Sequence, residues 1–385
     1  MSSISFAQQA ELSTPETQAP AQAGPTNAIR PSLGQGGVGA WGLQGSLGNA
    51  GVLDAISRSC LPKTPTTAEP EPELDPIAAD RALAAKELAD RFEVVGDDFE
   101  GERLSNQVTA AEYEKICQTY SDVRLGRGDL TIDASKYTDQ KDQDAYKAGA
   151  LNDIASLLQT NAGRSLVYSL SDNASHTDTK GDPIHKHTTL TPLLTDDGKV
   201  DKTNGYAAPE GWGSDATVGR DGTLKASEGT DVTIAYNPGV NVGDAYAEYQ
   251  DANPWLKGFR SDTILMHEGN HALKMTEGMC DPRTVARTDN KLDPRDPLMA
   301  QDARSGISRT EHQAVGLGLY ANDPMTENAY RAERKALAEG GGVGTIAGDA
   351  DLTQRTSYTP SAPARAIAEP VAAPTADPFA ELDTL

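Results

Sequence analysis

The sequence predicts an α+β fold, in which several helices and a small sheet occupy the middle of the chain between two long tails. Three observations lead to this prediction. Helical periodicity alternates with one clear strand between residues 76 and 340. One predicted helix contains His267-Glu268-Gly269-Asn270-His271, which has the form HExxH. Both ends of the chain are rich in Pro, Ala, Gly and Ser, as segments outside a folded core often are.

The two ends of the chain are predicted to be disordered. Residues 1–75 are rich in Ala, Pro, Gln, Gly, Ser and Thr, and residues 341–385 contain a long Pro/Ala run. Such segments bury too little apolar area to offset the entropy lost on ordering. We therefore expect one domain at residues 76–340, preceded by a disordered region compatible with an export signal and followed by a disordered tail.

The chain of 385 residues is acidic, with a formal net charge of −23 at pH 7. This charge argues against a nucleic-acid partner and against adhesion to anionic membranes. It favours solubility first and basic substrate segments second. No apolar run approaches membrane-spanning length, and the N-terminus lacks the basic start and apolar stretch of a secretory signal peptide. Three widely spaced cysteines, Cys60, Cys117 and Cys280, support neither a zinc ribbon nor a disulfide framework.

Helical patterns account for much of the predicted domain. We expect a first helix at 76–92, a second that follows Thr109 as N-cap with Glu112 completing a capping box, and a third at 142–158. Residues 163–168 continue as a helix or a strand. Later helices are expected at 255–275, 309–320 and 325–337.

Residues 171–229 are rich in Asp, Gly, Thr, Asn and Lys, and this composition predicts short hairpins and loops. His185 and His187 have a spacing that would let them bind a metal across a strand. The polar sequence around them, and around His176, instead favours a solvated loop.

The clearest strand is residues 230–236, where β-branched residues stand between turn residues. Two interpretations stay open for it. As an edge strand beside the HExxH helix, it would bind an extended substrate by strand addition. As a core strand, it would use its alternating apolar residues for packing.

The HExxH sequence predicts a zinc site. His267 and His271 are four residues apart on a helix, so both imidazoles lie on one face and reach a single Zn²⁺ ion. Glu268 lies beside the metal, where it accepts a proton from the water that attacks the substrate. The alternative is a pair of surface histidines on an ordinary helix. Gly269 is a weak helix former and is expected to let another segment approach closely.

A catalytic zinc site needs a third protein ligand. Glu311 is the best candidate, because it lies near the start of the predicted helix at 309–320. His312 and Glu277 compete with it. Glu277 is six residues past His271 and so points to another face of the helix, whereas His312 is the only other histidine downstream.

The segment Thr326-Glu327-Asn328-Ala329-Tyr330-Arg331 also has two interpretations. In the functional one, Glu327 accepts a hydrogen bond from a ligand histidine, and Arg331 or Tyr330 stabilises the oxyanion. In the structural one, Thr326 caps an ordinary helix in which Glu327 and Arg331 form an i,i+4 pair.

The order of these elements resembles the NleD-like (XopG/HopH-like) type III effector zinc metallopeptidases. The strand ending in Tyr236-Asn237-Pro238, the HEGNHA sequence, Glu311 and the Thr326–Arg331 segment follow one another as they do in that family, over about residues 140–337. The arrangement is also similar to the catalytic chain of clostridial neurotoxins. The resemblance implies a zincin-like metallopeptidase domain and places the third zinc ligand at Glu311. The preceding glutamate of those proteins is Thr310 here, so any role of that carboxylate is absent.

The resemblance also implies a setting. We expect a zinc-dependent endopeptidase that leaves a bacterium without a signal peptide, by type III secretion and with a secretion chaperone. It would act in the cytoplasm of a host cell on a host protein, with signalling kinases as one substrate class. Two alternatives remain. One is an antibacterial or self-processing metallopeptidase that stays in the bacterial cytoplasm or acts elsewhere, and the other is a non-catalytic zinc-binding interaction module.

Overall fold

The computed structural model describes residues 75–99, 101–174, 176–177, 183–202, 205–251, 253–285 and 307–356. Of the regions predicted to be disordered, 1–75 and 341–385, residues 1–74 and 357–385 lie outside the described residues. No helix in the described part of the chain is long and apolar enough to cross a membrane.

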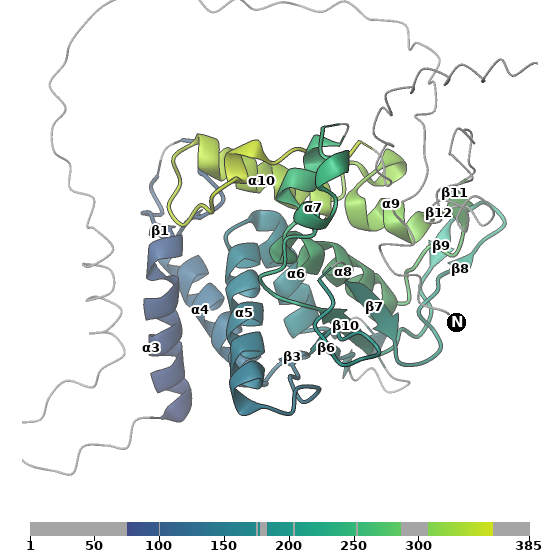
Figure 1. Ribbon diagram of the computed structural model, residues 1–385, viewed down its shortest axis with the longest axis horizontal. Helices are drawn as coiled ribbons and strands as arrows, with labels where there is room; N and C mark the ends of the chain where they lie inside the picture. Colours follow the sequence, from purple (N-terminus) through teal and green to yellow (C-terminus); the bar gives the residue numbers. More distant parts are fainter. Residues whose placement is uncertain are drawn as a thin grey trace, which may run out of the picture.

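Four helices come first in the domain. The predicted capping box is confirmed, because the Thr109 side chain accepts from the Glu112 N–H and the Glu112 carboxylate accepts from the Thr109 N–H. The segment whose type was left open, 163–168, is helical. The helices are α3 (Pro76–Leu88), α4 (Ala110–Arg124), α5 (Gln140–Leu158) and α6 (Asn161–Ser171). Three of them, α3, α4 and α5, lie on the left of Figure 1, and α6 lies nearer the middle, beside α8 (Ser261–Thr276).

The principal sheet has four strands in the order β3-β6-β10-β7. β3 (Leu130–Ile132), β6 (Thr188–Pro192) and β10 (Val232–Tyr236) are parallel, and β7 (Tyr206–Pro209) runs antiparallel to β10 at one edge. The sequence predicted β10, but it did not predict that the polar region at 171–229 supplies both neighbours of β10. The fold is therefore mixed α and β, as predicted.

The position of β10 decides between the two interpretations of that strand. β6 pairs with one edge of β10 and β7 pairs with the other, so both rows of its backbone hydrogen-bonding groups face other strands. Val232, Ile234 and Tyr236 are fully buried. β10 is a core strand, and the expectation that it binds substrate by strand addition is wrong. The edge strand beside the HExxH helix is β7.

Short elements complete the fold. β1 (Glu93–Val94) pairs with β2 (Gln107–Val108), β4 (His176–Thr177) with β5 (Pro183–Ile184), β8 (Thr217–Val218) with β9 (Leu224–Lys225), and β11 (Thr284–Val285) with β12 (Ile307–Ser308). A one-turn helix, α7 (Val242–Ala245), and a 3₁₀ turn, η2 (Ala247–Tyr249), follow β10.

The helix that carries the HExxH sequence, α8 (Ser261–Thr276), lies between the sheet and the first helices. It contacts β10 and β7 on one side, and α5 and α6 on the other. A Cβ on Gly269 would lie 2.8 Å from Leu166 Cδ2, so this glycine lets α6 approach α8 closely, as predicted.

The helix predicted at 255–275 is divided in two. Residues Pro254–Gly258 form a 3₁₀ turn, η3, and α8 begins at Ser261. The break follows from the backbone of Phe259, which is not helical, and from a β-bridge between Arg260 and Asn241. The predicted helix at 309–320 is likewise shorter. α9 (Arg309–Val315) ends where Gly316 adopts a φ of 84°, and a 3₁₀ turn, η4 (Gly318–Tyr320), follows.

The ordered domain extends beyond the predicted boundary at residue 340. After α10 (Glu327–Glu339) the chain turns back over that helix through η5 (Asp349–Asp351). Asp349, Leu352 and Arg355 are all at most 1% exposed. Residues 341–356 thus belong to the domain. Their Gly-rich start resembles a linker, but one apolar and two charged side chains anchor them in the tertiary structure.

Candidate metal centre

Helix α8 places His267, Glu268 and His271 in the interior. Their exposed fractions are 2%, 6% and 6%. Both imidazoles lie on one face of the helix because they are four residues apart. These histidines are therefore not surface residues of an ordinary helix.

Glu311, on α9, lies across from the two histidines of α8 and contacts both of them. One carboxylate oxygen, Oε2, lies 3.0 Å from His271 Nε2 and 3.3 Å from His267 Nε2. The two Nε2 atoms are 3.2 Å apart. The ligand atoms of these three residues form one compact group, as the sequence predicted from spacing and resemblance.

The donor atoms match the requirements of a zinc ion. His267 Nδ1 lies 3.0 Å from a Glu327 oxygen, which can only accept when ionised, so Nδ1 carries the hydrogen. If the His267 ring is neutral, its Nε2 atom carries a lone pair. That lone pair faces the Glu311 carboxylate and the Nε2 atom of His271. Such an arrangement needs a positive charge between the atoms. A tetrahedral zinc ion with bonds of about 2.0–2.1 Å would separate its ligands by ~3.3 Å, close to the distances here.

Without a metal, protons supply that positive charge. Burial lowers the pKa of His267, but hydrogen bonds to Glu311 and Glu327 outweigh it and raise that pKa to about 10. Burial also acts to raise the pKa of Glu311, and the two histidines hold it well below its usual range. Metal binding at this site would therefore displace protons.

Glu268 lies beside the group without belonging to it. Burial is the main cause that raises its pKa above the ordinary value, and the negative charge of Glu311 adds to the rise, while His267 and His271 oppose it. The backbone of Ala207 in β7 acts to lower that pKa as well. A carboxylate with a raised pKa in a buried site is suited to accept and return a proton.

Glu327, the first residue of α10, holds His267 in place. Its Oε2 receives the His267 Nδ1–H at 3.0 Å, and its Oε1 receives Arg331 Nε at 2.7 Å. Thr326 caps the helix by accepting from the Ala329 N–H. The structural interpretation of this segment and the Glu327 part of the functional one therefore both apply, because the i,i+4 pair and the contact with the histidine involve the same carboxylate.

Arg355 is part of the site, and the sequence analysis missed it. Its Nη1 lies 3.0 Å from Glu327 Oε2, and its guanidinium stacks 4.2 Å from the centre of the Trp255 ring. Asn328 fixes the backbone of Arg355 by two hydrogen bonds. Burial acts to raise the pKa of Glu327, but Arg355 and Arg331 together hold it far below its usual range. No local pattern marks Arg355, since it lies in a segment that reads as a tail.

The proposed oxyanion roles of Tyr330 and Arg331 are wrong. The Tyr330 hydroxyl donates to Asp262 at 2.7 Å, and Arg331 donates to Glu327 and to the carbonyl oxygen of Trp255. Both side chains are fully buried. They stabilise the contact of α10 with the first turn of α8 and with the segment before it, because helix α10 turns this face inward.

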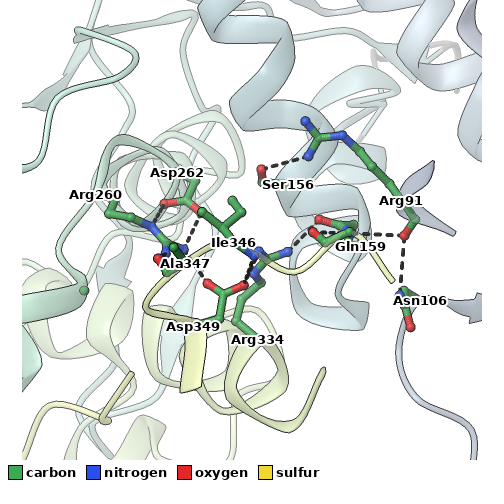
Figure 2. A network of polar contacts seen from close by, with 12 residues as sticks. Arg91, Asn106, Ser156, Gln159, Arg260, Asp262, Arg334, Ile346, Ala347 and Asp349 are labelled. Atoms are coloured by element: carbon green, nitrogen blue, oxygen red, sulfur yellow. Dashed lines mark hydrogen bonds and ion pairs between the residues drawn. The ribbon is translucent and has the colours of Figure 1, made fainter. Parts of the chain in front are cut away.

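A charged network joins the start of α8 to the returning C-terminal segment, as Figure 2 shows. Arg260 pairs with Asp262 at 3.1 Å and with Asp349 at 2.8 Å. The second oxygen of Asp349 accepts from Arg334, whose other nitrogen donates to Gln159 at 2.6 Å. Arg334 and Asp349 are fully buried. The network fixes the position of α10, and thereby of Glu327, relative to α8.

The competing ligands do not join the histidines. Glu277 forms an ion pair with Lys274 at 3.1 Å. His312 adjoins Glu311 on α9, but among the described residues only Glu311 shares a ligand group with His267 and His271. Thr310 contacts Ser308 at the start of α9, 2.6 Å between hydroxyl oxygens.

Comparison with known proteins agrees with this arrangement. No curated protein matches the chain. The model of peptidase family M91, described as an effector protein, matches residues 134–358, which is more than half of the chain and spans both the histidine helix and Arg355. The chain therefore belongs to this family and is a peptidase-type bacterial effector that acts on a protein substrate.

Proposed function

We propose that this protein is a zinc-dependent endopeptidase that enters a host cell and hydrolyses a host protein. One observation carries the proposal. His267 Nε2, His271 Nε2 and one Glu311 oxygen lie 3.0–3.3 Å from one another in a buried site, with the Glu268 carboxylate beside them. This is the donor set of a catalytic zinc site with three protein ligands.

In the proposed reaction, the zinc ion, Glu268 and Glu327 have separate roles. Zinc, when bound, supplies a Lewis acid that polarises the scissile carbonyl and makes water more acidic. Glu268 accepts a proton as the water oxygen bonds to the carbonyl carbon, and it returns that proton to the amine nitrogen when the C–N bond breaks. Glu327, held by Arg331 and Arg355, keeps the His267 ring in one tautomer and orientation.

An extended substrate would pair with β7. In the described part of the chain, β10 is the only strand beside β7. A Cβ on Gly205, directly before β7, would lie 3.4 Å from Glu268 Cγ, so the start of β7 adjoins the catalytic carboxylate. Strand addition here would bring a peptide backbone alongside the metal site.

The family description as an effector protein supports delivery into a host cell. Within the proposal, type III secretion with a secretion chaperone is the route, and the resemblance to NleD-like enzymes makes host signalling kinases the first substrates to test. The net charge of −23 would favour basic substrate segments.

Glu268→Gln tests the proposal most directly. The matched control is Glu277→Gln, at the end of the same helix and away from the site. Each protein is incubated with a lysate of eukaryotic cells, new protein N-termini are identified by mass spectrometry, and bound zinc is measured by elemental analysis. Wild type and control should produce the same new N-termini, whereas Glu268→Gln should produce none and still hold as much zinc.

Other outcomes have definite meanings. Cleavage by Glu268→Gln, or cleavage by wild type that survives complete zinc removal, would overturn the mechanism. Zinc binding without any cleavage would indicate an interaction module. Cleavage confined to the protein's own chain would indicate self-processing, and arrested bacterial growth relieved by Glu268→Gln would indicate an antibacterial toxin.

A further inference from the structure

A second group of metal-ligating side chains lies outside the site described above. Asp129 precedes β3, Asp172 follows α6, and His185 and His187 precede β6. The ligand atoms of Asp129, Asp172 and His185 all lie within 4.8 Å of one another. His185 Nδ1 is 2.7 Å from Asp129 Oδ2, and His187 Nδ1 is 3.4 Å from Asp129 Oδ1.

We propose that these four residues form a second binding site for a divalent transition metal of the zinc type. Two imidazole nitrogens and two carboxylates are ligands that such ions prefer, whereas calcium and magnesium prefer sites made of oxygen alone. With neutral imidazoles the group carries two negative charges, which one divalent ion neutralises. The exposed loop that composition predicted for His185 and His187 is confirmed, and the proposal adds metal binding to it.

Asp129 is the fixed member of the group. Its side chain is 9% exposed, and its Oδ2 accepts from the Asn173 N–H at 2.8 Å. Its backbone N–H donates to Ser171 and its carbonyl oxygen accepts from Thr188, so Asp129 ties α6 to β6. The protein thus holds one carboxylate in place before any metal binds.

The histidines are the movable members. Their side chains are 43% and 57% exposed, so both rings are free to shift outward from Asp129. That shift is needed, because ligands of one zinc ion stand ~3.3 Å apart and the present His185–Asp129 contact is a shorter hydrogen bond. In the described part of the chain, the Asp172 carboxylate has no hydrogen bond that would have to be broken.

The place of this site in the fold indicates a structural role. Asn173, which donates its N–H to Asp129, also donates its side-chain amide to Thr276 Oγ1 at 2.6 Å. Thr276 is the last residue of α8, just over one helical turn beyond His271. A metal at Asp129 would hold three chain segments together and, through Asn173, stabilise the end of the helix that carries the HExxH sequence.

Metal counting on the full-length protein tests the proposal independently of peptidase activity. Chelator-stripped protein is titrated with Zn²⁺ and with Co²⁺, whose visible absorption reports its ligands. The variants are His185→Ala, Asp172→Asn and Glu311→Ala, and the control is Lys186→Ala, which alters the same loop without removing a ligand. Wild type and Lys186→Ala should bind two ions per chain, and each of the other variants should bind one.

The two sites are distinguished by which variant removes which ion. The metal left in Glu311→Ala should disappear when His185→Ala is added, and the thermal unfolding midpoint of Glu311→Ala should rise with zinc while that of the double variant stays unchanged. If wild type and His185→Ala bind the same number of ions, the second site does not exist. A second ion that binds equally well to His185→Ala and Lys186→Ala would be adventitious and would also overturn the proposal.

Discussion

Arg355 Nη1 lies 3.0 Å from Glu327 Oε2, the same oxygen that accepts the His267 Nδ1–H. A residue 28 positions beyond Glu327 therefore completes the support of a candidate metal ligand. Arg331 neutralises the other oxygen of Glu327. Two buried arginines thus keep Glu327 ionised, and an ionised carboxylate is the form that orients His267 with its Nε2 lone pair towards Glu311.

Replacing Arg355 by Ala should weaken zinc binding by about 10- to 100-fold, the usual effect of losing support for a ligand histidine. Arg355→Lys should retain part of the affinity, because it keeps the charge but not the stacking on Trp255. Zinc affinity is measured by competition with a chromophoric chelator, and the control is Glu339→Gln, an exposed residue at the end of α10. A folded Arg355→Ala protein, by circular dichroism, with wild-type zinc affinity would contradict this assignment.

Glu311→Gln should lose most of the zinc at the histidine site. The amide keeps the shape of the carboxylate but not the negative charge that offsets the metal, so the pKa of His267 should also fall towards its ordinary value. Elemental analysis after dialysis measures the metal. Retention of all the zinc in Glu311→Gln, with its loss in His312→Ala, would make His312 the third ligand instead.

Asp153→Asn should stabilise the protein at pH 8. Asp153 is 4% exposed, its Oδ2 is buried without a hydrogen bond, and burial together with the charge of Asp262 raises its pKa well above the ordinary value. The folded state therefore binds this proton more tightly than the unfolded state. Between the unfolded and folded pKa values, the wild-type free energy of unfolding falls as pH rises, by up to about 1.4 kcal/mol per pH unit.

Urea unfolding at pH 5 and pH 8, with zinc held constant, measures this effect. The advantage of Asp153→Asn over wild type should grow between the two pH values, while Asp144→Asn, exposed on the same helix α5, should show no such trend. An Asp153→Asn variant that is equally destabilised at both pH values would show that Asp153 acts through its hydrogen bond with Ser261 rather than through its charge.

Gly205→Ala should lower peptide cleavage without removing zinc. A Cβ at this position would lie 2.4 Å from Ile264 Cγ2 on α8, and Ile264 is a stiff β-branched side chain. The strand β7 must then move away from α8 and from Glu268. A shift of ~1 Å at a catalytic group costs on the order of 100-fold in rate.

The readout is kcat/KM for a peptide that wild type cleaves, together with zinc content. Adding Ile264→Ala should restore part of the activity in the double variant, because it removes the clashing methyl group. Gly205→Ala with wild-type kcat/KM would show that β7 does not position the substrate.

The sequence alone determined the local features of this protein. The spacing of His267 and His271, the capping box at Thr109 and the alternation in residues 232–236 depend on neighbours within a few positions, and helical and strand geometry fix the consequences of such spacing. Glu311 could also be predicted from the sequence as a ligand, because few acidic residues follow α8 near the start of a helix.

The tertiary structure decided everything that depends on long-range pairing. Only the sheet order shows that β10 is internal and that β7 is the edge beside Glu268. Only the return of residues 341–356 over α10 brings Arg355 to Glu327. Which strands pair, and which buried charges meet, is set by burial and charge compensation over the whole chain. Composition therefore made residues 341–356 look like a tail, while two buried charges and one leucine place them in the domain.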